Sequence, residues 1–82
     1  MTSRAPKRQS ARELLANNLR ILRAAKRLTQ QELAELASID RGFLLDLEAG
    51  NRRASVDTID KLAHALGIAP HELLLPRDAG AR

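Results

Sequence analysis

Cysteine, tryptophan and tyrosine are absent from this 82-residue chain, and Phe43 is its only aromatic residue. The lack of cysteine excludes disulfides and thiolate metal sites. No apolar run approaches the roughly 18 residues that a membrane-spanning helix needs. The charged residues near the N-terminus are not followed by the apolar stretch of a signal peptide. We therefore expect a cytoplasmic protein with a core of aliphatic side chains.

Residue groups that would support catalysis or metal binding are also missing. None of the serines has a paired histidine, and no glycine-rich loop is present to hold a phosphate. His64 and His71 do not lie in a metal-ligand pattern with each other. The sequence therefore predicts no enzyme activity, no metal, no cofactor and no small-molecule ligand.

The charge is unevenly distributed along the chain, whose net charge is +4. Residues 1–27 hold eight basic side chains against one acidic, whereas residues 28–82 hold six against nine. A basic region favours a polyanionic partner such as nucleic acid, although a solvated basic leader would look the same. We expect a disordered basic arm over 1–9, a folded domain over 10–76 and a loose tail over 77–82.

Four capping residues mark the starts of predicted helices. Ser10 and Thr29 each stand three positions before a glutamate, which is a capping box. Asp40 and Ser55 are N-caps of the same kind. Leucine and alanine residues at helical spacing follow each cap. The predicted helices run from Ser10 to about Lys26, from Thr29 to near Ala37, from Asp40 to near Glu48, and from Ser55 to Gly67.

Glycine and proline mark the remaining boundaries. Gly50 and Gly67 are placed to end helices in the left-handed conformation. Pro70 suits the first position of a fifth, short helix, which we expect to hold residues 73–75 before Pro76 ends it. The second and third helices are short and close together, so they must pack crosswise on a third element. That is the helix-turn-helix arrangement, whose second helix can enter a DNA major groove.

Five short patterns follow one another in order between Leu15 and Leu75. They are Leu19-x-x-Leu22-Arg23, Leu28-Thr29-Gln30-x-Glu32-Leu33-Ala34, Ile39-Asp40-Arg41, Leu47-Glu48-x-Gly50 and Leu62-Ala63-x-Ala65-Leu66-Gly67. Together they resemble the Cro/repressor-type (XRE-like) helix-turn-helix family. The resemblance implies an all-α, five-helix, lambda-repressor-like DNA-binding domain. Ile39-Asp40-Arg41 and Asn51-Arg52-Arg53 look most like the controller proteins of restriction–modification systems.

The third helix is the expected DNA-reading helix. Helical spacing points Leu44, Leu47 and Glu48 toward the core, and Gly42 and Asp46 away from it. The resemblance implies that the first, second and sixth residues after the cap read bases. These residues are Arg41, Gly42 and Asp46.

Each of these residues has more than one interpretation. Arg41 can pair with guanine O6 and N7, or touch a phosphate or a nearby acid instead. Gly42 either brings the backbone close to DNA or is not read. Asp46 can accept from cytosine N4, but we favour a restraining role in which it holds Arg41 or Arg52. Phe43 can contact a thymine methyl group or pack on the loop over 51–54.

The resemblance also implies backbone contacts at two places. Thr29 and Gln30, at the start of the second helix, are expected to bind a phosphate, helped by the helix N-terminal amides. Asn51, Arg52 and Arg53 are expected to do so in the loop that follows the third helix. Such contacts give salt dependence rather than sequence choice.

Two further expectations concern structure rather than recognition. The resemblance implies a partly buried ion pair between Arg23 and Glu48, which would fasten the first helix to the third. Arg27 and Ser38 stand where the family usually has glycine. If either backbone is left-handed, the non-glycine residue costs of order 1 kcal/mol.

The last helix indicates how the chain assembles. Three consecutive leucines, Leu73, Leu74 and Leu75, cannot all face one small core, and Ile68 is nearby. An exposed apolar patch of this kind is a plausible interface, and the resemblance implies a two-fold dimer there.

We therefore expect a homodimeric transcriptional regulator that binds double-stranded DNA at a near-palindromic operator, with RNA polymerase as a candidate partner. The alternative is an antitoxin or a protein-interaction module that keeps the fold but binds DNA weakly.

Overall fold

The computed structural model describes residues 9–77, which fold into four α-helices and one short 3-10 helix without any strand. The elements are α1 (Ala11–Ala25), α2 (Gln30–Ala37), α3 (Arg41–Glu48), α4 (Val56–Leu66) and η1 (Pro70–Leu74). No helix in this part of the chain is both long and apolar enough to cross a membrane. Apart from Gln9 and Arg77, the predicted arm and tail lie outside the described residues.

The all-α class is confirmed, but the expectation of a fifth α-helix was wrong. The last element, η1, is a 3-10 helix, and Leu75 follows it in an extended conformation with φ −82° and ψ 139°. The physical reason is the pair of prolines. Pro70 opens the element and Pro76 forces the residue before it out of the helical region, so little more than one turn fits between them.

The four predicted N-caps are confirmed. Ser10 and Thr29 each close a full capping box with the glutamate three positions later. Asp40 accepts a hydrogen bond from the amide of Phe43 at 3.2 Å, and the Ser55 hydroxyl accepts one from the amide of Thr58 at 3.0 Å. At the other ends, Gly50 and Gly67 have φ values of 77° and 72°. These local contacts set where each helix begins and ends.

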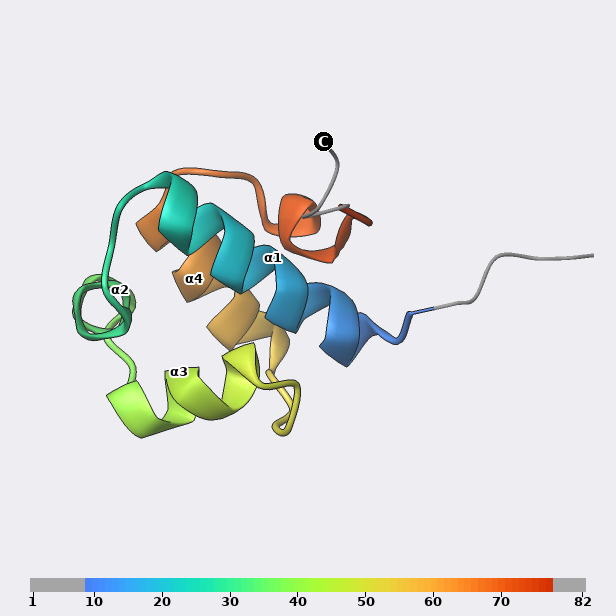
Figure 1. Ribbon diagram of the computed structural model, residues 1–82, viewed down its shortest axis with the longest axis horizontal. Helices are drawn as coiled ribbons and strands as arrows, with labels where there is room; N and C mark the ends of the chain where they lie inside the picture. The colour runs from blue at the N-terminus through green and yellow to red at the C-terminus, as the bar shows by residue number, and fades with distance from the viewer. Residues whose placement is uncertain (1–8, 78–82) are drawn as a thin grey trace, which may run out of the picture.

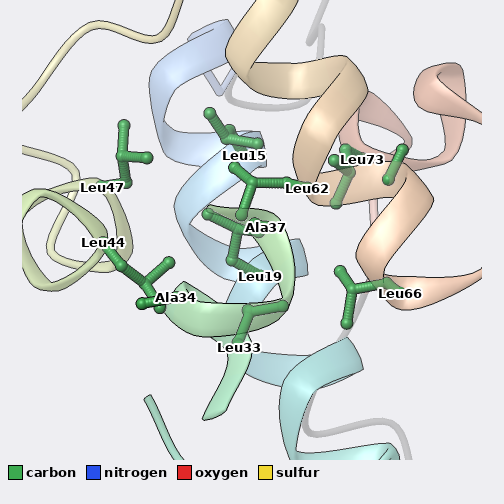
Figure 2. Packing of buried hydrophobic residues seen from close by; sticks show 11 residues of the cluster. Leu15, Leu19, Leu33, Ala34, Ala37, Leu44, Leu47, Leu62, Leu66 and Leu73 are labelled. Carbon is green, nitrogen blue, oxygen red and sulfur yellow. The ribbon is translucent and has the colours of Figure 1, made fainter. Parts of the chain in front are cut away.

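The helices enclose one aliphatic core. In Figure 1, α1 runs across the middle of the molecule, α2 is seen nearly end-on, and α3 lies below α1. Helix α1 packs against α3 and η1, while α2 packs against α3 and α4. Figure 2 shows the leucine and alanine side chains of all five elements converging. Because α2 and α3 pack crosswise on this core, the outer face of α3 stays exposed to solvent.

A buried asparagine fastens the C-terminal segment to α1. The side chain of Asn18 is fully buried, and its Nδ2 donates to the carbonyls of Leu73 at 2.7 Å and Leu75 at 2.8 Å. The neighbouring Asn17 donates to the carbonyl of Arg77 at 3.0 Å. Our reading of the sequence did not identify Asn18. A signal was present, because Asn18 lies on the same helical stripe as Leu15 and Leu22 and asparagine is a poor helix former.

Two non-glycine residues within 9–77 adopt the left-handed conformation. Arg27, before α2, has φ 58°, and Ser38, in the turn between α2 and α3, has φ 57°. A side chain in this region meets the following carbonyl, at a cost of roughly 1–2 kcal/mol. Glycine at either position would remove this strain. The gain in stability would be partly offset, because glycine also makes the unfolded chain more flexible.

Replacing Ser38 with glycine is expected to raise the free energy of unfolding by about 0.5–1 kcal/mol. The measurement is urea denaturation followed by circular dichroism. Ala49→Gly is the matched control, because Ala49 is also exposed at a helix end but has φ −86°. That control should lower stability. A Ser38→Gly protein that is destabilised like Ala49→Gly would contradict the assignment of strain to the turn.

Candidate nucleic-acid interface

Helix α3 has one buried face and one open face, as its spacing predicted. Leu44, Leu47 and Glu48 are buried, whereas Arg41 and Gly42 are exposed. Arg41 is the first residue of the helix, so its long side chain extends from the end that follows the turn. The open face therefore begins with an exposed guanidinium group, the side chain that best matches guanine in the major groove.

The N-cap accounts for the glycine at position 42. A Cβ added there would lie 3.0 Å from Oδ2 of Asp40, the oxygen that accepts from the amide of Phe43. A larger residue would require the capping carboxylate to shift by a few tenths of an ångström. Gly42 thus keeps the cap intact and leaves bare backbone on the open face of α3. The contact with the N-cap accounts for glycine at position 42 without a role in base recognition.

Phe43, Asp46 and Arg52 form one cluster beside the open face of α3. The guanidinium carbon of Arg52 lies 4.9 Å from the centroid of the Phe43 ring. Its Nη1 also lies 3.2 Å from Oδ2 of Asp46. Both charged side chains are about half exposed, at 53% and 49%. The cluster orients Arg52 beside α3, which corresponds to the loop-packing interpretation of Phe43 and the restraining interpretation of Asp46.

The opposite face of α3 is held by a buried network around Glu48. This carboxylate is 3% exposed and accepts from Arg23 through Nε at 2.7 Å and Nη2 at 3.1 Å. Arg23 also donates to the carbonyl of Leu28 at 2.9 Å. Arg20, which our sequence reading missed, donates to the backbone carbonyl of Glu48. Two arginines of α1 thereby bind Glu48 and hold the C-terminal end of α3 against α1.

The same network positions Gln30 at the start of α2. Its Nε2 donates to Oε1 of Glu48 at 3.0 Å. An amide group carries two hydrogens, so Gln30 can hold Glu48 with one and donate to a phosphate with the other. Thr29 next to it accepts from the amide of Glu32 at 3.0 Å, and a hydroxyl that accepts can still donate. The two residues expected to bind phosphate therefore stand together at one helix end.

The predicted loop contacts are all on the surface. Asn51, Arg52 and Arg53 are exposed, and the amide of Asn51 donates to the carbonyl of Asp46 at 2.9 Å. Because this bond joins the loop to the last turn of α3, the arginines are presented close to the recognition helix. Arg41 lies at one end of α3 and the loop arginines at the other.

The predicted dimer residues divide into two groups. Leu73 is in the core, which corrects the expectation that it lies in the interface: it packs under α1 and has no exposed surface. Leu75 is 43% exposed, while Ile68 and Leu74 are half-buried. The expectation that at least one of the three leucines would be exposed is confirmed.

Within residues 9–77, no group of three histidine or acidic side chains is arranged to hold a metal ion. His64 and His71 are both exposed.

Comparison with known proteins identifies this arrangement. The helix-turn-helix family HTH_3 matches residues 19–73, which run from α1 to η1. The chain belongs to this family. A helix-turn-helix protein is built to present one helix to DNA, and the protein is a DNA-binding transcriptional regulator. The resemblance stated from sequence is thus confirmed.

Individual helix-turn-helix proteins show the same similarity. The crystal structure of a hypothetical transcription factor from Neisseria is 36% identical with a TM-score of 0.81, covering 93% of this chain and 87% of that one. The restriction-modification controller protein C.AhdI from Aeromonas hydrophila is 44% identical with a TM-score of 0.73, covering 76% and 94%. Control protein C.BamHI from Bacillus amyloliquefaciens is 36% identical over 77% of this chain and 79% of its own length.

Proposed function

We propose that this regulator binds a near-palindromic operator as a homodimer, with Arg41 reading a base in each half-site. The observation that carries the proposal is the exposed Arg41 at the start of α3, a helix whose other face is locked by Glu48. Thr29 and Gln30 on one side, and Asn51 to Arg53 on the other, would position the helix through phosphates. In a dimer, the two recognition helices would lie about 34 Å apart, one turn of DNA.

The proposed dimer surface is the apolar patch of Ile68, Leu74 and Leu75. Ile68 and Leu74 are half-buried against the edge of the core, and Leu75, which follows Leu74 in the chain, is 43% exposed. Leu73 supports the patch from the core without reaching its surface. Burying Leu75 against a second copy would remove apolar surface from water on both protomers.

Replacing Leu75 with aspartate is expected to weaken dimerisation at least about tenfold, the lower end of what burying one leucine contributes. Sedimentation equilibrium measures the change. The fold should persist, because Leu75 is exposed in the single chain. Leu36→Asp is the matched control, since Leu36 is 58% exposed but lies on α2. Equal dimerisation of wild-type protein and Leu75→Asp would place the interface elsewhere.

The controller class is the functional type that the comparisons support best. C.AhdI, C.BamHI and control protein C.SmaI from Serratia marcescens are all similar to this chain. We propose that the protein is a regulator of the same type. On this proposal it acts in the cytoplasm, where its DNA lies, and has no enzymatic role.

RNA polymerase is the proposed protein partner. A regulator bound beside a promoter meets the polymerase, and α2 offers it a groove of about 330 Å³ lined by Leu28, Glu32, Glu35 and Leu36. Two carboxylates around an exposed leucine complement a basic surface with apolar residues. In transcription assays at equal operator occupancy, Leu36→Asp should change promoter activity. Unchanged promoter activity would show that RNA polymerase does not contact this groove.

A further inference from the structure

A second groove lies beside the loop over 51–54, at the start of α1. It measures about 280 Å³. Its floor is formed by Leu15, Ile59 and Leu74, which are buried or half-buried, and three exposed arginines border it. The arginines are Arg12, Arg52 and Arg53. No aspartate or glutamate is among the side chains of residues 9–77 that line this groove.

Arg12 is unfavourably placed for its own helix. It is the second residue of α1, and a cation near a helix N-terminus is repelled by the helix dipole. It also shares the groove with two further guanidinium groups. Arg52 is paired with Asp46, but within the described residues neither Arg12 nor Arg53 forms an ion pair. The fold therefore gathers three guanidinium groups here, and only that of Arg52 has a carboxylate partner within the described residues.

An anion would compensate this charge, and the groove's position indicates which one. Arg52 and Arg53 lie in the loop that follows α3, so the groove continues the surface that would face DNA. A guanidinium group matches the geometry of a phosphate, and an apolar floor reduces the screening of the pair by water. The sugar–phosphate backbone of the operator is the occupant that fits both the charge and the location.

We propose that Arg12 is a DNA-binding residue that contacts a backbone phosphate, extending the phosphate surface from the loop onto the first turn of α1. The inference rests on the proposed function. Because Leu74 belongs to both the groove and the proposed dimer patch, the contacted phosphate lies on the inner side of each half-site, toward the two-fold axis. Arg12 positions the dimer on DNA and does not read sequence.

The test compares Arg12→Ala with wild-type protein on the duplex upstream of its own gene and on a scrambled duplex, across a salt series. Two phosphates lose their partner in a dimer, so the slope of log K against log salt should become shallower by about 1.8 on both duplexes. Affinity at 0.15 M salt should fall about ten- to thirtyfold, the weight of two released counterions. The melting temperature should stay equal or rise, because a repelled cation is removed.

Lys26→Ala is the matched control, because it removes one positive charge from the other end of α1. Nζ of Lys26 lies near Gly67, at the end of α4. In Figure 1 the C-terminal end of α1 lies away from the loop that follows α3. No DNA contact is proposed for Lys26, so Lys26→Ala should change the salt slope by less than Arg12→Ala does.

An unchanged slope for Arg12→Ala, while wild-type protein still binds steeply and specifically, would overturn the inference and leave the proposed function intact. Loss of dimerisation in Arg12→Ala would also overturn it, since the groove would then belong to the subunit contact. If wild-type protein shows no specific binding, the proposed function itself fails.

Single methylphosphonate substitutions in the duplex locate the contact. Neutralising the inner phosphate should weaken DNA binding by wild-type protein but leave DNA binding by Arg12→Ala unchanged. Additive losses from the two changes would contradict a direct contact between them.

Discussion

Glu48→Ala is expected to lower the free energy of unfolding by about 3–5 kcal/mol, the usual cost of breaking a buried ion pair from one side. The substitution leaves the guanidinium group of Arg23, 20% exposed, and the amide of Gln30 without the carboxylate they share. For a small domain with a total stability of roughly 5–15 kcal/mol, such a loss is a large fraction. Urea denaturation followed by circular dichroism measures it.

Two further variants separate burial from charge. Asp46→Ala removes the exposed partner of Arg52 and should cost no more than about 1 kcal/mol. The double variant Arg23→Met, Glu48→Leu replaces both buried charges with apolar groups and should recover most of the stability lost in Glu48→Ala. Equal costs for Glu48→Ala and Asp46→Ala would show that the Glu48 network does not hold α3 in place.

Arg41→Ala is expected to weaken binding to the native duplex by roughly 2 kcal/mol or more per dimer, since each half-site loses a contact of about 1–3 kcal/mol. That corresponds to roughly thirtyfold or more in the dissociation constant. Binding to a scrambled duplex should change much less. Fluorescence anisotropy with both duplexes gives the two constants, and the fold should be unaffected because Arg41 is exposed.

Arg53→Ala is the matched control for Arg41→Ala. Both residues are exposed arginines, but Arg53 lies in the loop where phosphate contacts are proposed. Removing the Arg53 side chain should weaken binding to both duplexes by similar factors and make the salt slope shallower. Equal losses on both duplexes for Arg41→Ala would make it a phosphate contact and leave the base-reading role to another residue.

The features predicted correctly from sequence depend on contacts a few residues apart. Ser10, Thr29, Asp40 and Ser55 cap their helices with amides three positions away, and such spacing is visible in the chain itself. The buried and open faces of α3 follow from helical periodicity in the same way. The family resemblance added the pairing of Arg23 with Glu48, which the spacing of the two residues alone does not reveal.

The features missed depend on contacts between distant parts of the chain. Asn18 meets carbonyls that lie more than fifty residues later. Leu73 could not be separated from Leu74 and Leu75 until the direction of η1 was known. The groove around Arg12 needs α1 and the loop over 51–54 side by side. The hydrogen bond from Gln30 to Glu48 likewise depends on how α2 and α3 pack together, which the sequence does not give.

Specific DNA binding by the exposed face of α3 underlies the roles proposed for Arg41 and the phosphate-contacting residues. The most direct measurement is fluorescence-anisotropy binding to the duplex upstream of the protein's own gene, beside a scrambled duplex, across a salt series. We expect at least about 10³-fold tighter binding to the native duplex, with a steep negative salt slope. Weak and equal binding to both duplexes, lost near physiological salt, would contradict it and leave only a basic surface without sequence recognition.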